Sequence, residues 1–213
     1  MLAEISPLAL GLAGSLVAGL MTGVGALPVL AGRVPSPAMR DTMLGFAAGV
    51  MLTASFFSLI VPAIEVTPRI YGAGMAPALI AATGVLLGMG AVAWLNQALP
   101  HEHFISGREG PATESLRRIW LFIIAITLHN FPEGLAVGVG FGSGDIGNGI
   151  ALAVGIGLQN VPEGLAVAVA LAGEGYGRAR AVWFATLTGL VEPLGGLLGA
   201  GVVSIAEPLL PWG

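Results

Sequence analysis

Six long apolar stretches constrain the fold of this chain more than any other feature. They cover residues 7–30, 43–66, 75–99, 119–141, 146–171 and 181–205. As a helix, each is long enough to cross the hydrocarbon core of a bilayer, about 30 Å thick. None alternates apolar with polar residues as a barrel strand does. The sequence therefore predicts an all-α fold, a polytopic membrane bundle of six transmembrane helices.

The composition supports this interpretation and excludes several classes of protein. Charged residues make up 9% of the 213 residues, against about 25% in soluble domains, and the mean hydropathy is +0.90. A soluble enzyme is therefore excluded. The chain contains no cysteine, so any metal must be held by oxygen and nitrogen ligands. Its basic residues are scattered arginines without a basic face, and we expect no nucleic-acid partner.

The connections between the apolar stretches are short, so residues 1–213 form a single transmembrane domain. The longest connection, residues 100–118, joins the third and fourth stretches. Seven of the eight basic residues follow the first, third or fifth stretch, namely Arg33, Arg40, Arg108, Arg117, Arg118, Arg178 and Arg180. The positive-inside rule then places the 100–118 loop in the cytoplasm and the N-terminus outside.

Two related motifs occupy the fourth and fifth stretches. Residues 129–140 read HNFPEGLAVGVG and residues 159–170 read QNVPEGLAVAVA, so 8 of the 12 positions are identical. Consecutive spans run in opposite directions, so the two copies face one another antiparallel. Repeated helices interrupted by proline near the bilayer midplane often build ion sites in transporters.

The spacing within each motif brings polar side chains together. His129 and Glu133 are four residues apart, hence on one helix face, and Asn130 is three residues from Glu133. Gln159, Asn160 and Glu163 repeat this arrangement. A third intramembrane carboxylate, Glu192, precedes Pro193 in the sixth stretch.

Carboxylates in a membrane are costly, at about 2.5–3.5 kcal/mol each on insertion scales, so we expect them to serve a function. Carboxylate, imidazole and amide ligands without thiolates suit a divalent ion such as Zn²⁺, Fe²⁺, Mn²⁺, Co²⁺ or Cd²⁺. The metal is the cargo in this interpretation, and the lipid bilayer is the other partner.

These motifs closely resemble those of the ZIP (Zrt/Irt-like) family of divalent metal transporters, in particular its bacterial branch. The resemblance implies uptake of zinc across a prokaryotic inner membrane. It also covers Ser55 and the cytoplasmic His101-Glu102-His103 segment. For that segment, and not for Ser55, it implies a metal-collecting role. The family usually has eight spanning helices, so we expect the last two to be missing from this chain.

The resemblance also implies a paired metal centre between the fourth, fifth and sixth helices, in which Glu133 and Glu163 bridge two positions. One position uses His129, Glu133, Gln159 and Glu163; the other uses Asn130, Glu133, Asn160, Glu163 and Glu192. Some members of the family have histidine at the position of Gln159 and aspartate at that of Asn160. With weaker ligands at both positions, the resemblance leaves open whether one or two ions bind. The motif helices are expected to move as a block against the others.

Other interpretations remain open from the residues alone. An intramembrane metal-dependent hydrolase would also use His and Glu ligands, but the chain has no His-Glu-x-x-His run. A non-transporting helical bundle leaves three intramembrane glutamates unexplained. A proton-coupled carrier of an organic cation would not require a metal. Recurrent pairs of small residues, Gly19/Gly23, Gly45/Gly49, Gly84/Gly88, Gly134/Gly138 and Gly195/Gly199, predict close helix packing and are compatible with a homodimer.

Overall fold

Six helical segments in the structure are long and apolar enough to cross a membrane. The computed structural model describes residues 5–98, 101–103, 107–109 and 118–212. The six segments are Pro7–Val29, Pro37–Tyr71, Ala76–Trp94, Ile123–Gly142, Ile146–Gly173 and Arg178–Ile205. The prediction of an all-α bundle with six spans is therefore confirmed.

Local sequence signals explain where the main helices begin. Ser6 and Ser36 cap the first two spans by accepting a hydrogen bond from a backbone N–H three residues on, and each is followed by a proline at the first helical position. Proline is favoured there because its missing N–H has no intrahelical partner to lose. Asp145 caps the fifth span, with its Oδ1 accepting from the backbone N–H of Asn148 at 3.0 Å.

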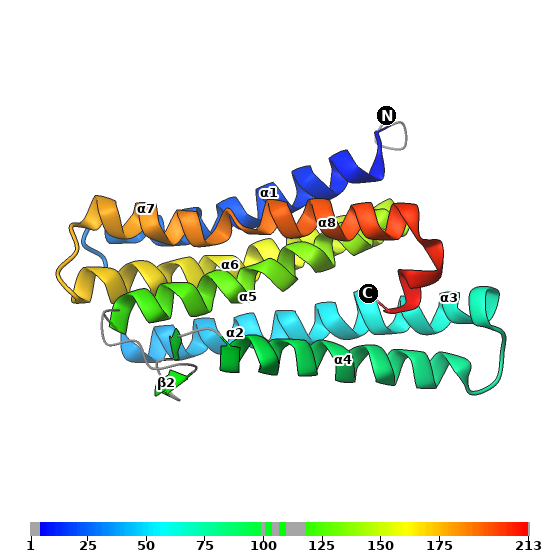
Figure 1. The fold of residues 1–213 in the computed structure, drawn as a ribbon. Helices are drawn as coiled ribbons and strands as arrows, with labels where there is room; N and C mark the ends of the chain where they lie inside the picture. Colours follow the sequence, from blue (N-terminus) through cyan, green and yellow to red (C-terminus); the bar gives the residue numbers. More distant parts are fainter. Residues whose placement is uncertain (1–4, 99–100, 104–106, 110–117, 213) are drawn as a thin grey trace.

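The helices form two groups of different packing (Figure 1). The first group contains α1 (Pro7–Ala26), α5 (Arg118–Gly142), α6 (Ile146–Gly173), α7 (Arg178–Gly189) and α8 (Glu192–Ile205). The second is a hairpin of α2 (Pro37–Ala54), α3 (Val61–Tyr71) and α4 (Ala76–Ala98) that lies beside α5 and α6. In the four spans of the first group, 39–50% of the apolar stretch is buried within the chain. In each of the two spans of the hairpin, the buried share is 6%.

Glycines explain the close packing of the first group. A Cβ at Gly134 or Gly138 of α5 would collide with the backbone of α8 at Glu192 or Gly196. A Cβ at Gly164 of α6 would collide with the backbone of α1. Such small residues let helix backbones approach in lipid. In the hairpin, by contrast, a Cβ at Gly45, Gly49 or Gly88 would meet no atom within 4 Å. The predicted close contacts thus form at three of the five glycine pairs, and they join only the first group.

Two spans differ from the continuous helices expected. The second contains a π-helical turn, η3 (Ser55–Ile60), between α2 and α3. The sixth is divided at Leu190 and Val191 into α7 and α8, so that Glu192 is the first residue of a helix. By contrast, α5 and α6 continue through Pro132 and Pro162 without a break. A single lost backbone hydrogen bond is tolerated in a membrane helix when neighbouring groups compensate for it.

Few polar bonds link the hairpin to the first group. The Asn148 side chain at the start of α6 donates to the carbonyl of Ser58 in η3 at 2.8 Å. The Tyr71 hydroxyl at the end of α3 donates to the carbonyl of Pro208 at 2.6 Å. Pro208 lies in η4 (Glu207–Trp212), the short 3-10 helix that folds back from α8 toward α3 (Figure 1).

The loop between α4 and α5 contains an element that was not predicted. Strand β1 (His101–His103) pairs antiparallel with β2 (Gly107–Glu109). The rest of the 100–118 loop lies outside the described residues, as do the side chains of His101, Glu102 and His103. Their metal-collecting role stays a prediction.

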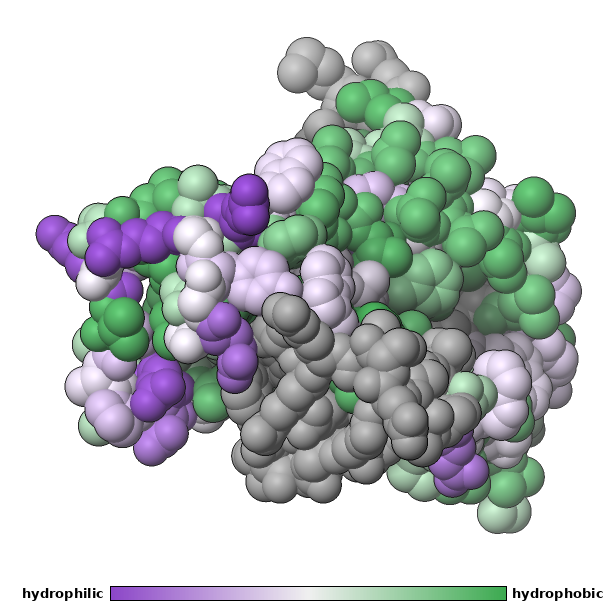
Figure 2. Space-filling view, turned by 60° about the vertical axis from the view of Figure 1, so that its left-hand side comes forward, coloured by the Kyte–Doolittle hydropathy of each residue, from purple (hydrophilic) through white to green (hydrophobic). Residues whose placement is uncertain are grey.

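The surface agrees with a membrane environment. Figure 2 shows hydrophobic residues over broad areas of the visible face and hydrophilic residues in a few clusters. Large apolar side chains are exposed along the hairpin, including Leu52, Phe57, Leu86 and Trp94. A water-soluble protein rarely exposes such extended apolar areas, whereas lipid accepts them.

Candidate metal centre

The predicted ligands come together where α5, α6 and α8 cross. Asn130 and Glu133 lie on α5, Gln159, Asn160 and Glu163 on α6, and Glu192 at the start of α8. All six are buried, with exposed fractions of 9% or less. Because a Cβ at Gly134 would collide with the backbone of Glu192, the glycine after Glu133 is what allows α8 to approach so closely.

Gln159 is the centre of a hydrogen-bond network that joins α5 to α6. Its Nε2 donates to Glu133 Oε1 across the helix pair and to Asn160 Oδ1 at 2.7 Å. The same nitrogen lies 3.5 Å from Glu163 Oε2. The two motif glutamates are therefore held on either side of one amide group.

Asn160 extends this network to two further helices. Its Nδ2 donates to Glu192 Oε1 of α8 at 2.7 Å and to the backbone carbonyl of Ala18 in α1 at 2.8 Å. This contact of the centre with α1 was not predicted from the sequence. The small residues around Ala18 are a signal of close packing, but which partner helix they contact depends on the tertiary fold.

His129 lies at the edge of this cluster. Its side chain is 50% exposed, and its Nε2 is 3.6 Å from Glu133 Oε1. The predicted spacing of one helical turn is thus present, with the imidazole on the accessible side of the buried carboxylates.

Several buried polar atoms of these residues have no hydrogen-bond partner. Within the described residues, these atoms are Thr22 Oγ1, both polar atoms of Asn130, Glu133 Oε2, Glu163 Oε1 and Glu192 Oε2. Leaving such groups unpaired in a buried site is costly. Four of them are carboxylate or amide oxygens of predicted ligands, and oxygen donors of this kind suit a divalent cation.

The side chains do not by themselves form a ready cage of acidic or imidazole ligands. Among the described residues, no group of three or more His, Cys, Asp or Glu side chains is placed to hold a metal ion. The amides of Gln159 and Asn160 lie between the carboxylates and connect them.

Comparison with known proteins identifies the family. Residues 100–212 match the family described as ZIP zinc transporter. The chain is 44% identical over 203 residues to the zinc transporter GufA of Myxococcus xanthus, an alignment that covers 95% of this chain and 80% of GufA. The chain belongs to the ZIP family.

Two further ZIP relatives support this assignment. The zinc transporter ZIPB of Bordetella bronchiseptica is 48% identical over 183 residues, which cover 86% of this chain and 59% of ZIPB. The human zinc transporter ZIP11 is 36% identical over 273 aligned positions, with 90% of this chain and 80% of ZIP11 covered. ZIP proteins are integral membrane transporters and not enzymes, so the transporter interpretation is confirmed over the hydrolase.

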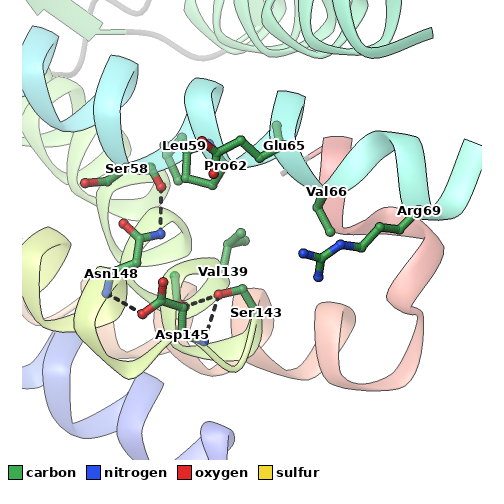
Figure 3. Close-up of a pocket in the computed structure, with 12 residues that line it drawn as sticks. Ser58, Leu59, Pro62, Glu65, Val66, Arg69, Val139, Ser143, Asp145 and Asn148 are labelled. Carbon is green, nitrogen blue, oxygen red and sulfur yellow. Dashed lines mark hydrogen bonds between the residues drawn. The ribbon is translucent and has the colours of Figure 1, made fainter. Parts of the chain in front are cut away.

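A separate polar pocket lies at one end of this ZIP protein, between α3 and the turn from α5 to α6 (Figure 3). It has a volume of about 220 Å³, and its lining includes Glu65, Arg69, Ser143, Asp145 and Asn148. Asp145 is also the residue that caps α6. The exposed side chains of Glu65 and Arg69 place one charge of each sign on the α3 wall.

Proposed function

We propose that this chain carries Zn²⁺ across the cytoplasmic membrane of a prokaryote, from outside to the cytoplasm, and that Fe²⁺, Mn²⁺, Co²⁺ and Cd²⁺ are accepted as alternative cargo. The observation that carries the proposal is the set of unpartnered buried oxygens on Asn130, Glu133, Glu163 and Glu192. Family membership supports zinc as the cargo, because the relatives named above are zinc transporters.

The ligands in this proposal are His129, Asn130, Glu133, Gln159, Asn160, Glu163 and Glu192. Glu133 and Glu163 have the central role because each has one oxygen facing the Gln159 amide and one without a partner. Such a carboxylate can ligate an ion without first breaking all of its hydrogen bonds. His129, half exposed at the edge, would meet an ion as it enters or leaves.

In this proposal, alternating access is a movement of one group of helices relative to the other. The moving block contains α1, α7 and α8 in addition to the motif helices α5 and α6, because glycine contacts join all five backbones. The α2–α4 hairpin would be the other part, since it packs mainly through side chains and is linked by few polar bonds. The positive-inside rule supports an outside N-terminus.

The test is zinc influx into proteoliposomes that contain a zinc-sensitive dye. We expect saturable influx with the wild-type chain and almost none with the Glu133→Ala, Glu163→Ala double variant. A matched control, Asp41→Ala with Glu174→Ala, removes two exposed carboxylates outside the centre and should retain influx. Equal rates for the wild type and the first double variant would contradict the proposed centre. Wild-type zinc binding without influx would contradict transport by this chain alone.

A further inference from the structure

The orientation of the Gln159 amide is determined by its surroundings. The Nδ2 of Asn160 must point to the carbonyl of Ala18, which can only accept, and it also donates to Glu192. The Oδ1 of Asn160 therefore faces Gln159. Because this Oδ1 can only accept, the group of Gln159 that meets it is the NH₂, and the same nitrogen is the atom near Glu133 and Glu163. The group that lies between Glu133 and Glu163 must then be the NH₂ and not the carbonyl.

This orientation prevents an ion from binding through the two carboxylate oxygens that the amide faces, Glu133 Oε1 and Glu163 Oε2. A neutral amide nitrogen offers a cation no lone pair, whereas the amide oxygen is a suitable ligand. The hydrogens of Nε2 point toward Glu133 Oε1 and Asn160 Oδ1, and Glu163 Oε2 is within 3.5 Å. An ion that bridges Glu133 and Glu163 through these oxygens needs the space that the NH₂ fills.

We propose that the Gln159 amide is a reversible cross-link, which joins Glu133 to Asn160 through its NH₂ with Glu163 Oε2 beside it, and which must turn to present its oxygen before an ion can bind through Glu133 Oε1 and Glu163 Oε2. The proposal rests on the proposed function, since it concerns how that centre takes its cargo. The last torsion angle of glutamine is broad and roughly two-fold, so the turn requires no strained rotamer. It exchanges hydrogen bonds for metal coordination.

Asn130 provides a contrast within the same centre. It is another buried amide among the predicted ligands, but neither of its polar atoms has a hydrogen-bond partner within the described part of the chain. Replacing Gln159 by an apolar side chain of similar shape should leave buried acceptors unpaired, which destabilises a fold. Replacing Asn130 in the same way removes unpaired groups, which is neutral or stabilising.

The first experiment uses the full chain in detergent micelles, treated with a chelator, and compares melting temperatures. We expect Gln159→Met to melt about 4 °C or more below the wild type. Asn130→Leu should melt at or above the wild-type temperature. If Gln159→Met melts like the wild type, the Gln159 amide does not cross-link Glu133 to Asn160 and the proposal is overturned.

The second experiment observes the amide directly. The sequence contains only two glutamines, Gln97 and Gln159, so protein labelled with ¹⁵N in glutamine side chains gives two NH₂ signals. Gln159→Met identifies the signal of Gln159, and Gln97, exposed on α4, is the internal control. Without metal, the Gln159 protons should exchange slowly with solvent. Adding Zn²⁺ should shift this signal and speed its exchange at least tenfold, while Gln97 stays unchanged.

The outcomes separate this proposal from the proposed function. If equilibrium dialysis shows that Zn²⁺ binds while the Gln159 signal and its exchange stay unchanged, the amide does not turn and the proposal is overturned. Rapid exchange of the Gln159 protons before metal is added would also overturn it. If dialysis shows no zinc binding, the proposed function fails, and the melting comparison still decides whether the cross-link exists.

Discussion

The close approach of α5 and α8 yields a quantitative prediction for Gly134→Ala. The new Cβ would lie 2.6 Å from the Cα and 2.7 Å from the carbonyl carbon of Glu192, and nearer still to its carbonyl oxygen. Ordinary van der Waals contact begins near 3.4 Å, so relieving the contact with the carbonyl oxygen requires the two backbones to separate by about 1 Å. Both sides of the contact are main chain in a closely packed interior.

Overpacking of this kind costs about 1–3 kcal/mol. For a chain of this size, a cost of about 2 kcal/mol corresponds to a fall of about 4–8 °C in melting temperature. The same displacement moves Glu192 away from Asn160, so zinc influx should also fall.

The matched control is Gly45→Ala, on the exposed face of α2, where the added Cβ meets no atom within 4 Å. Alanine is the better helix former, so this variant should melt at or slightly above the wild-type temperature. Both variants can be measured by the same thermal unfolding assay in detergent. If Gly134→Ala melts as Gly45→Ala does, α5 and α8 are not in backbone contact at Glu192, and the argument for how the carboxylates meet is wrong.

Four further predictions concern the centre and its surroundings. Zinc influx should weaken as the external pH falls from about 7.5 to 5.5, because carboxylate and imidazole ligands must lose their protons to bind a metal; a flat profile in the dye assay would contradict this. Gln159→His should change the relative uptake of Zn²⁺, Fe²⁺ and Cd²⁺, measured by competition, because an imidazole nitrogen replaces an amide; unchanged ratios would mean that residue 159 does not touch the cargo. The wild type has no cysteine, so an impermeant maleimide can report the topology of the variants Ala73→Cys and Glu174→Cys. In intact cells it should label Ala73→Cys and leave Glu174→Cys unlabelled. Asn148→Ala removes the hydrogen bond to the Ser58 carbonyl and should lower the melting temperature by about 2–4 °C, the effect of about 1 kcal/mol; an unchanged melting temperature would show that this bond contributes nothing.

The sequence predicts the spans well because their signal is simple. Apolar length alone places all six, with every predicted boundary within six residues of the observed one. Apolar length misses the break before Glu192, although Pro193, in the first turn of α8, is a local signal for a helix start there. The π-helical turn beginning at Ser55 has no such signal.

The site is predictable in its residues but not in its contacts. The duplicated motif identifies Glu133 and Glu163, and helical spacing places His129 one turn from Glu133, as the structure shows. The link from Asn160 to Ala18 joins residues 142 positions apart, which no local pattern reports. The central position of the Gln159 amide also depends on how α5 and α6 are docked, and only the structure reveals that its NH₂ lies between the glutamates.

Three polar bonds of the described residues join the hairpin to the rest of the bundle, and a hairpin that tilts would have its pivot there because all three lie toward one end. Asn148 bonds to η3 and Tyr71 to η4, whereas α2 extends away from both of them to Pro37. The helical segment from Ser58 back to Pro37 is about 30 Å long. A tilt of about 5° at the pivot would therefore move the start of α2 by about 3 Å, roughly the width of a water molecule.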